Sequence, residues 1–408
     1  MTDSSMRSVR VAVVTTPLTV PPRDGVSAFA KSALGAINDA GHQVILVVFD
    51  DGHASAIDQM HAAYDMCEIV VVPLRLRSSS IAHRLGRRLL SALMLVPPAQ
   101  VPYVASLPLM KRQLAELAAD VVVAFGNSPG LAIGDSVRCG AVLQFSLPEV
   151  DVTLGGNGRW RQLLAAMWQR RLARSARVLL ATTSTDVAAI SARFPRAEVR
   201  MIPFAVKPNL RLRPGRSPRL LFVGDFNYEP NAAAARELSS RVLPEFFLAV
   251  PDAEVLIAGK ASDALQIGGL DPRVRLIGQY EAIEDFATER TVGILPLVAA
   301  GGVRTRVFEY AAAGIPLVAT HASVAGLPPE ALGGVVVTDQ ADLAAVCSRL
   351  FRAHEELDRL REAGLVSLSK AANGADAIKA WTDVVASLDE RGPGRPLVAS
   401  AKDKARRM

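Results

Sequence analysis

Short valine-rich runs alternate with helical patterns along most of the chain, and this rhythm constrains the fold more than any other feature. Two parallel strands need a long crossover between them, usually a helix, so the alternation predicts βαβ units and parallel sheets. Strands are expected at 9–15, 43–49, 69–73, 121–125, 141–145, 178–182 and 199–203, and then at 219–223, 254–258, 274–277, 292–295, 316–320 and 335–338. The predicted fold class is α/β, with doubly wound sheets.

With 408 residues, of which 50% are hydrophobic, the chain is long and apolar enough for two domains with large cores. Segment 207–218 is rich in Pro, Gly and Arg and is typical of a linker. We expect an N-terminal domain at 1–206, a C-terminal domain at 219–370, a further helix at 371–390, and a disordered basic tail at 391–408. Ligands of such sheets bind at the carboxyl ends of the strands, so a site is expected in a cleft between the domains.

The chain is basic, with a formal net charge of +6, which suits nucleic acid, anionic lipid or phosphorylated small molecules. Aromatic residues make up only 5% and the basic residues are dispersed, so we do not expect nucleic-acid binding. The three cysteines fit no metal or disulfide spacing, and the residues before the first strand lack the apolar core of a signal peptide. We therefore expect a cytoplasmic protein without a metal or other cofactor.

Segment 296–320 is the most informative for chemistry, because it predicts a strand, a Gly-Gly turn, a helix and a second strand. The N-terminus of a helix attracts anions through its free N–H groups and its dipole. Arg304 and Arg306 add guanidinium groups there, and these suit phosphate oxygens. Glu309 lies three residues after Arg306, so its carboxylate can share that helix face and accept hydrogen bonds from sugar hydroxyls. The pattern indicates a nucleotide-sugar site, and the alternative is an ion pair on a solvated helix.

Several motifs together resemble the GT-B glycosyltransferases of family 4, the glycosyl transferases group 1. The resemblance is strong in the second half, at 221–231 (LFVGDFNYEPN), 254–260, 274–278 and 296–327. In the first half it rests on the glycine-led helix after Gly25, on Gly41-His42, and on the hinge strand 200–206. It implies a GT-B fold, in which two Rossmann-like domains face each other across a cleft and C-terminal helices pack back on the first domain.

The resemblance also implies the roles of the site residues. Arg304 and Arg306 would clamp the donor's diphosphate and Glu309 would bind its ribose, which makes these three the catalytic residues. The other donor-binding residues would be Gly224, Asp225, Lys260, Gly278, Gly301, Gly302 and Val303, although Asp225 and Lys260 also fit surface positions. Gly301 stands where the family has the first glutamate of its E-x7-E motif, so one carboxylate contact to the donor sugar is missing.

On the acceptor side, the candidates follow expected strands: Asp24, Gly25, Asn127 and Glu149. The resemblance implies a retaining reaction, which needs no protein nucleophile. An inverting reaction would need a base in the first domain, and Asp24, Glu149 and Asp151 are open candidates for it. His42 is expected at a helix end, as a cation that complements the dipole.

Segment 75–112 begins with clustered arginines and then has no charge between Arg88 and Lys111. Its four prolines, including Pro102 and Pro108, interrupt any continuous helix of membrane-spanning length. One interpretation is peripheral contact with anionic lipid at the inner face of the membrane. The other is a loop and helix buried against the sheet of the first domain.

We expect a hexosyltransferase-like enzyme that moves a sugar from a nucleotide-diphosphate-sugar donor to a glycan, lipid-linked or small-molecule acceptor in cell-envelope or glycan biosynthesis. Two alternatives remain. One is a catalytically silent GT-B relative that acts as a partner or scaffold, which Gly301 motivates. The other is a GT-B sugar-nucleotide epimerase, which would turn over nucleotide-sugars without an acceptor.

Overall fold

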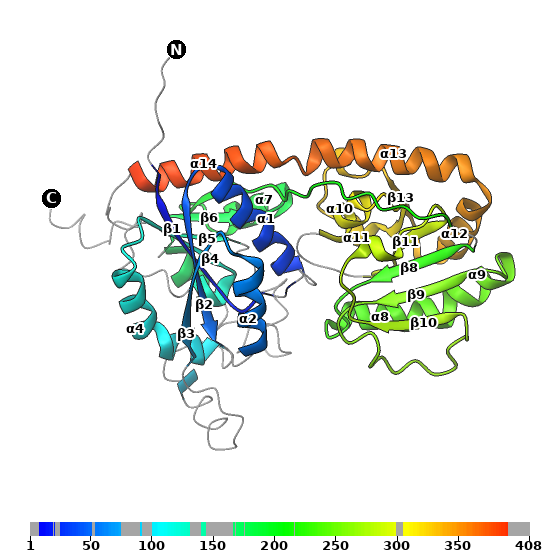
Figure 1. Ribbon diagram of the computed structural model, residues 1–408, viewed down its shortest axis with the longest axis horizontal. Helices are drawn as coiled ribbons and strands as arrows, with labels where there is room; N and C mark the ends of the chain where they lie inside the picture. The colour runs from blue at the N-terminus through cyan, green and yellow to red at the C-terminus, as the bar shows by residue number, and fades with distance from the viewer. Residues whose placement is uncertain are drawn as a thin grey trace, which may run out of the picture. The chain divides into compact units, whose positions relative to one another are not determined.

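The computed structural model describes residues 8–18, 20, 25–50, 54–74, 90–91, 100–130, 140–143, 166–167, 169–174, 176–215, 217–298 and 305–390. The chain divides into two compact units (Figure 1). The N-terminal unit comprises Met1–Val20, Ala33–Ile202 and Ile378–Met408, and the C-terminal unit comprises Pro21–Ser32 and Pro203–Ala377. Helices α1 (Gly25–Asp39) and α14 (Gly374–Glu390) therefore each contribute residues to both units.

The N-terminal unit is built on a seven-stranded parallel sheet with the strand order β3-β2-β1-β4-β5-β6-β7. The strands are β1 (Arg10–Thr15), β2 (Gln43–Asp50), β3 (Glu68–Pro73), β4 (Val121–Phe125), β5 (Gly140–Leu143), β6 (Val178–Ala181) and β7 (Glu198–Met201). The strand predictions for this half of the chain are confirmed. They succeed because central parallel strands are covered on both faces and read as continuous apolar runs, as β1 and β2 do.

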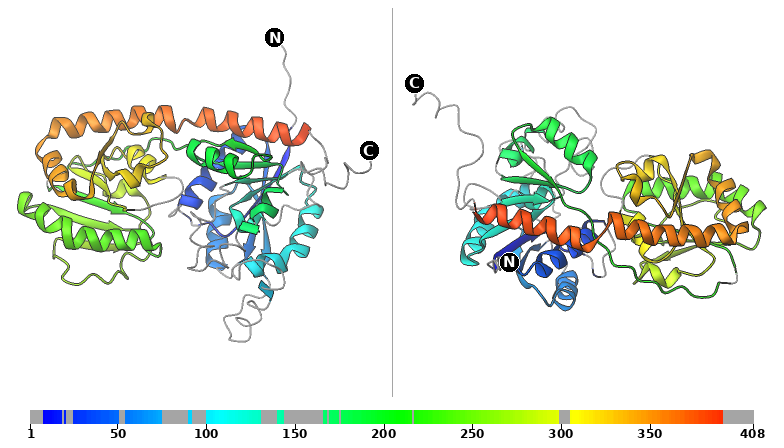
Figure 2. Two further views of the ribbon diagram at one scale, coloured as in Figure 1. Left: turned by 180° about the vertical axis from the view of Figure 1, so that it is seen from behind. Right: turned by 90° about the horizontal axis from the view of Figure 1, so that it is seen from above.

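The described helices of this unit, besides α1 and α14, are α2 (Ala54–Ala63), α4 (Val101–Glu116), α5 (Asn127–Gly130) and α7 (Ser184–Arg193), seen from two further sides in Figure 2. Helix α4 buries Val101, Met110 and Leu114 in the core of the sheet. It continues through Pro108, so the expectation that this proline interrupts a helix is wrong. Pro108 is exposed, and Pro102 lies in the first turn, where a missing N–H costs no helical hydrogen bond.

The C-terminal unit is built on a six-stranded parallel sheet with the order β10-β9-β8-β11-β12-β13. The strands are β8 (Arg219–Val223), β9 (Glu254–Ala258), β10 (Val274–Gly278), β11 (Thr291–Leu295), β12 (Leu317–Thr320) and β13 (Val335–Thr338), and each matches a predicted strand. Counted within the unit, this is the 3-2-1-4-5-6 order of Rossmann sheets. The order reverses between β8 and β11, and their pairing extends only to Leu221 and Gly293.

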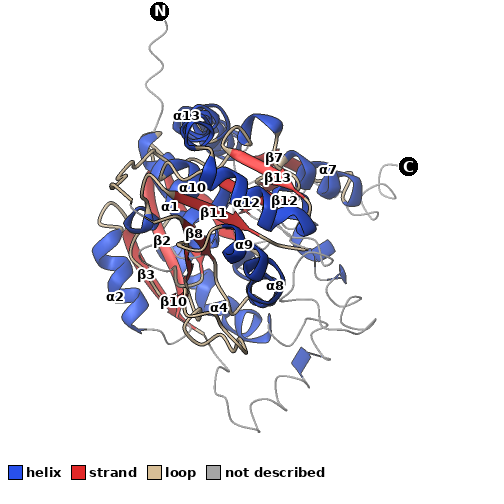
Figure 3. Ribbon diagram, turned by 90° about the vertical axis from the view of Figure 1, so that its right-hand side faces the viewer, coloured by secondary structure: helices blue, strands red, loops and turns tan. Residues whose placement is uncertain are grey.

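Helices cover both faces of the C-terminal sheet (Figure 3). One face carries α8 (Glu229–Glu237), the π-helical turn η2 (Leu238–Val242), α9 (Leu243–Ala249) and α12 (Leu343–Arg352). The other carries α10 (Thr305–Ala312) and α13 (His354–Ala371), which contact each other. The shorter elements are η3 (Ile283–Phe286), α11 (His321–Val324), η4 (Pro329–Ala331) and η5 (Gln340–Asp342).

Contacts within the C-terminal unit explain why the first half of α1 belongs to it. Phe29 of α1 stacks on Phe204 with ring centroids 5.9 Å apart, and Phe204 lies 5.6 Å from the ring of Phe308 on α10. The hydroxyl of Ser32 accepts a hydrogen bond of 3.0 Å from the N–H of Ala205. All three rings are at least 95% buried, so they form a small apolar core of their own.

His42, between α1 and β2, is buried, and both of its ring nitrogens are without a hydrogen-bond partner among the described residues. Burial lowers the pKa of His42, and the charge of Asp389 only partly opposes this shift. His42 does lie at the end of α1, as expected, but burial favours the neutral ring over the expected cation. In the part of the chain that the structure describes, no helix has the length and hydrophobicity needed to cross a membrane.

Candidate functional site

Six of the predicted donor-side residues lie at one edge of the C-terminal sheet, because the carboxyl ends of parallel strands meet there. Gly224 and Asp225 follow β8, Lys260 follows β9, Gly278 ends β10, and Arg306 and Glu309 lie on α10, which follows β11. Gly301, Gly302, Val303 and Arg304 lie outside the described residues. This edge, at the reversal of strand order between β8 and β11, is where ligands of such sheets bind.

Three glycine turns are tied together at this edge. The N–H of Gly259 donates to the carbonyl of Gly278 over 2.7 Å, and the N–H of Gly278 donates to the hydroxyl of Ser262 over 2.9 Å. A Cβ atom on Gly259 would lie only 1.9 Å from the carbonyl oxygen of Gly224, and the residue has a φ of +130°. Only glycine fits there. The sequence analysis missed Gly259, although a glycine that directly follows a buried strand was a readable signal.

Asp225 and Lys260 shape this edge in different ways. A carboxylate oxygen of Asp225 accepts a 2.9 Å hydrogen bond from the N–H of Asn227, and Asn231 donates to the Asp225 carbonyl over 2.9 Å. Asp225 thus closes the turn that leads into α8. The carbonyl of Lys260 accepts from the N–H of Phe226 over 2.8 Å, while the residue itself is exposed.

Arg306 and Glu309 form an ion pair on α10, and Nη1 of Arg306 also lies 3.2 Å from the hydroxyl of Tyr280. The two charged side chains are only 15% and 17% exposed, so the pair is not the solvated surface pair of the alternative reading. Burial alone would lower the pKa of Arg306, but the charge of Glu309 raises it above its ordinary value. The site therefore holds one permanent cation and one carboxylate in contact, largely shielded from water.

Tyr280, two residues after β10, was missed by the sequence analysis. Its ring packs edge-on against Phe286 with centroids 5.3 Å apart, which directs the hydroxyl to Arg306. Burial raises the pKa of Tyr280, so the phenol stays protonated. Its position just beyond Gly278 was the only signal in the sequence.

Tyr310, next to Glu309 on α10, attaches the helix to the end of β8. Its hydroxyl donates to the carbonyl of Leu221 over 2.9 Å and accepts from the N–H of Val223 over 3.0 Å. The ring lies over Gly293 of β11, where a Cβ atom would come within 2.7 Å of it. Burial raises the pKa of Tyr310 far above its ordinary value. The tyrosine therefore fixes the position of α10 relative to the sheet, at the point where β8 and β11 separate.

Of the predicted acceptor-side residues, the structure describes Gly25 and Asn127, which belong to different units. Gly25 is the first residue of α1 and belongs to the C-terminal unit, whereas Asn127 begins α5 after β4 in the N-terminal unit. Asp24, Glu149 and Asp151 lie outside the described residues. Among the residues that the structure describes, no three His, Cys, Asp or Glu side chains gather as metal ligands would.

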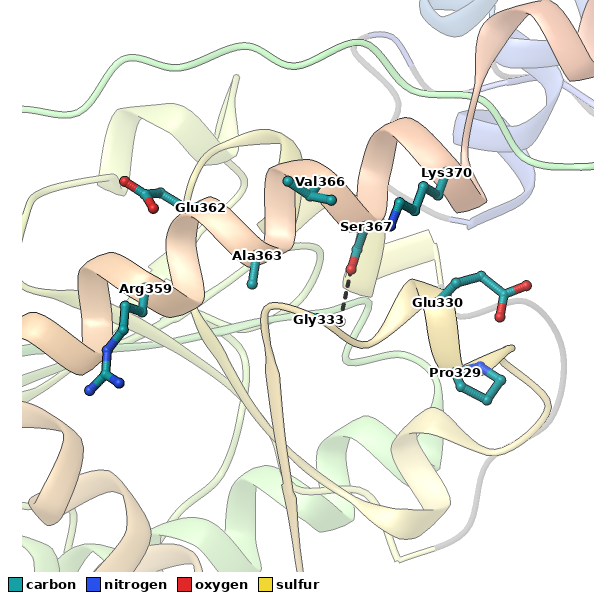
Figure 4. A pocket seen from close by; sticks show the side chains of 9 residues that line it. All are labelled: Pro329, Glu330, Gly333, Arg359, Glu362, Ala363, Val366, Ser367 and Lys370. Carbon is teal, nitrogen blue, oxygen red and sulfur yellow. Dashed lines mark hydrogen bonds between the residues drawn. The ribbon is translucent and has the colours of Figure 1, made fainter.

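An open pocket of about 530 Å³ lies elsewhere on the C-terminal unit, between α13 and the segment around η4 (Figure 4). Its lining residues are Pro329, Glu330, Gly333, Arg359, Glu362, Ala363, Val366, Ser367 and Lys370. Ser367 accepts a 2.8 Å hydrogen bond from the N–H of Gly333, which precedes β13. The pocket thus lies at the amino ends of the strands, the opposite edge from Arg306, and contains no predicted site residue.

Two family models match the chain side by side. Residues 217–353 match the family described as glycosyl transferases group 1, and residues 24–205 match the family described as glycosyl transferase 4-like domain. The chain therefore belongs to the family 4-like glycosyltransferases of the GT-B fold, which confirms the resemblance seen in the sequence. It is a glycosyltransferase of GT-B type. A comparison with curated proteins finds no match.

Solved structures show the same fold at low sequence identity. Sucrose-phosphate synthase from Thermosynechococcus elongatus is 14% identical, with a TM-score of 0.64 over 94% of this chain and 98% of that one. HepE from Anabaena in complex with UDP-glucose is 12% identical, with a TM-score of 0.64 over 92% and 100%. WaaG, a glycosyltransferase involved in lipopolysaccharide biosynthesis, is 13% identical, with a TM-score of 0.54 over 93% and 99%.

Proposed function

We propose that this glycosyltransferase takes its sugar from a nucleotide-diphosphate-sugar donor bound at the carboxyl ends of β8 to β11. The observation that carries the proposal is the shielded pair of Arg306 and Glu309 on α10, where a cation for phosphate and an acceptor for sugar hydroxyls lie side by side. Arg304, at the N-terminal side of the same helix in the sequence, adds a second cation. The structures of Anabaena HepE with UDP and with UDP-glucose support this class of donor.

In this proposal the protein acts mainly by stabilising charge. As the bond to the sugar breaks, negative charge grows on the departing diphosphate, and fixed cations lower the energy of that state. Arg304 and Arg306 supply them, and Glu309 holds the ribose. The turns around the donor contribute Gly224, Asp225, Lys260, Gly278, Gly301, Gly302 and Val303. The transfer is retaining, as the family resemblance implies, the transferred group is a hexose, and neither a metal nor another cofactor takes part.

We further propose where the enzyme works. The acceptor is a glycan, lipid-linked or small-molecule substrate of cell-envelope or glycan biosynthesis, bound through Asp24, Gly25, Asn127 and Glu149. The protein is cytoplasmic, with peripheral contact to the inner face of the membrane through 75–112. The basic residues of this segment support such contact, whereas the burial of Val101, Met110 and Leu114 shows that α4 also serves the core.

Nucleotide binding tests the donor site directly. UDP, GDP, ADP and dTDP are titrated into the wild type, Arg306→Ala and the control Arg241→Ala, which removes a 77% exposed arginine paired with Glu237. One nucleotide should bind the wild type and the control equally. Arg306→Ala should bind it about 10- to 100-fold more weakly, the affinity equivalent of a charge-assisted hydrogen bond. Equal affinity in all three proteins would contradict the assignment of Arg306.

Measuring the turnover of the nucleotide-sugar distinguishes the transferase from the epimerase and from the silent relative. Release of nucleotide from its sugar only in the presence of an acceptor indicates the transferase. Conversion of the nucleotide-sugar without an acceptor would instead indicate the epimerase. Binding without any turnover would indicate a silent relative, in which the loss of the first glutamate at Gly301 has removed activity.

A further inference from the structure

The two residues that the proposed function assigns to different parts of the donor are bound to each other in the structure. Nη1 of Arg306 contacts Oε2 of Glu309 and also the hydroxyl of Tyr280, at 3.2 Å. Both charged side chains are at least 83% buried, which follows from their exposed fractions of 15% and 17%. Water therefore screens this pair much less than it screens an exposed one.

A diphosphate placed on Arg306 would meet the Glu309 carboxylate at close range. Two like charges at such a distance repel each other, and the repulsion is stronger where water is largely excluded than in bulk water. The repulsion falls if Glu309 turns to a hydroxyl group, since the carboxylate then keeps a hydrogen bond while the phosphate takes the guanidinium. The ribose of the same donor offers such hydroxyls.

We propose that Arg306 exchanges partners when the donor binds: the diphosphate replaces Glu309 on the guanidinium, and the released carboxylate takes the ribose. This exchange deepens the proposed function and rests on it. While the two side chains are paired, each blocks the other, so neither half of the donor binds well by itself. The whole donor supplies new partners to both residues at once, and the site thereby favours intact nucleotide over free phosphate or nucleoside.

The surroundings allow side-chain exchange without movement of the helix. Tyr310 holds α10 to β8 through hydrogen bonds to Leu221 and Val223. Tyr280 approaches Arg306 from the turn after β10, a separate element, so this contact can persist while Glu309 leaves. Arg306 keeps its charge throughout, because an arginine side chain is not deprotonated in proteins.

The test uses the two halves of the donor as separate probes. Inorganic pyrophosphate represents the diphosphate, and uridine, guanosine, adenosine and thymidine represent the nucleoside. Each is titrated by calorimetry or ligand-observed NMR into the wild type, Glu309→Gln and Arg306→Met. These two variants remove one charge each and nearly preserve the shape of the side chain, and circular dichroism verifies that they are folded.

The proposed exchange of partners predicts that each substitution changes the affinities for pyrophosphate and for the nucleoside in opposite directions. Glu309→Gln should bind pyrophosphate about tenfold more tightly and the nucleoside more weakly, because the competitor for Arg306 is gone together with the ribose ligand. Arg306→Met should bind the nucleoside about tenfold more tightly and pyrophosphate more weakly. In the wild type, pyrophosphate should raise the affinity for the nucleoside, and linkage requires the reverse effect to be equal. Either single variant should abolish this coupling.

If Arg306 and Glu309 instead stay paired when the donor binds, the opposite change in nucleoside affinity is expected for Arg306→Met. If Glu309 binds ribose while it stays on Arg306, then Arg306→Met removes its support and lowers nucleoside affinity, which overturns the exchange. In that case the nucleoside diphosphates still bind the wild type. Absence of any nucleoside diphosphate binding to the wild type would overturn the donor site itself, and the exchange with it.

Discussion

At the scale of single residues, Tyr310 joins the helix of the candidate site to the strand beside it. Tyr310→Phe keeps the ring over Gly293 but leaves the carbonyl of Leu221 and the N–H of Val223 without this partner. An unsatisfied buried polar group costs about 1–3 kcal/mol, so the free energy of unfolding should fall by that order. Urea unfolding of the variant measures the loss.

Tyr228→Phe is the matched control, since Tyr228 precedes α8 and its side chain makes no capping hydrogen bond. Its unfolding free energy should stay within about 0.5 kcal/mol of the wild type. Equal stability of Tyr310→Phe and the wild type would show that the hydroxyl does not hold α10 in place.

The same scale shows how far the sequence could predict the site. Arg306 and Glu309 are three residues apart, so helical periodicity alone indicated their contact. Tyr280 reaches Arg306 across 26 residues of sequence, and Tyr310 reaches Val223 across 87. Contacts of that kind depend on how strands are ordered in the sheet, and no local pattern reports them. Gly293, which makes room for the ring of Tyr310, carries no signal until that neighbour is known.

At the scale of elements, the strands were predictable because parallel strands buried on both faces are continuous apolar runs. The irregular features of the helices could not be predicted in this way. Helix α4 continues through Pro108, and the π-helical turn η2 joins α8 to α9, because tertiary packing outweighs local preference in both places. The charge of His42, between α1 and β2, was also predicted wrongly from a local preference. A helix end favours a cation, but burial of His42 disfavours the charged ring more strongly.

His42 therefore predicts a pH dependence of stability. Its pKa in the folded chain lies below the ordinary value of 6.5, so below that pH the unfolded chain binds the proton more readily. The folded state should keep its full stability above about pH 6.5 and lose some as the pH falls below it. His42→Leu should reduce this loss between about pH 7 and 5, as measured by urea unfolding at each pH.

The exposed His61 in α2 provides the control. His61→Gln should lose stability with falling pH as the wild type does, because it leaves the buried ring of His42 in place. A pH dependence unchanged in His42→Leu would mean that burial of His42 does not oppose its protonation.

At the scale of the whole molecule, the N-terminal unit is completed by the far end of the chain. Residues 378–390 of α14 belong to it, and Trp381, Val384, Val385 and Leu388 are each at most 1% exposed. Arg200 of β7 donates a 3.2 Å hydrogen bond to the carbonyl of Asp383. The sequence predicted a crossing helix only through the family resemblance, since an amphipathic helix does not reveal which sheet it covers.

Truncation tests this dependence. Full burial of one large apolar side chain contributes about 1.5–3 kcal/mol, so four of them approach the roughly 5–15 kcal/mol that stabilises a whole domain. A chain that ends at residue 377 should therefore lose the cooperative unfolding of its N-terminal unit and expose that sheet to proteolysis, although every strand of the sheet is still encoded. A chain that ends at residue 390 is the control, because it keeps the whole of α14 and lacks only residues outside the described ranges. If the shorter chain resists protease as well as the control does, the N-terminal unit folds without α14, and the helix serves another purpose than completing its core.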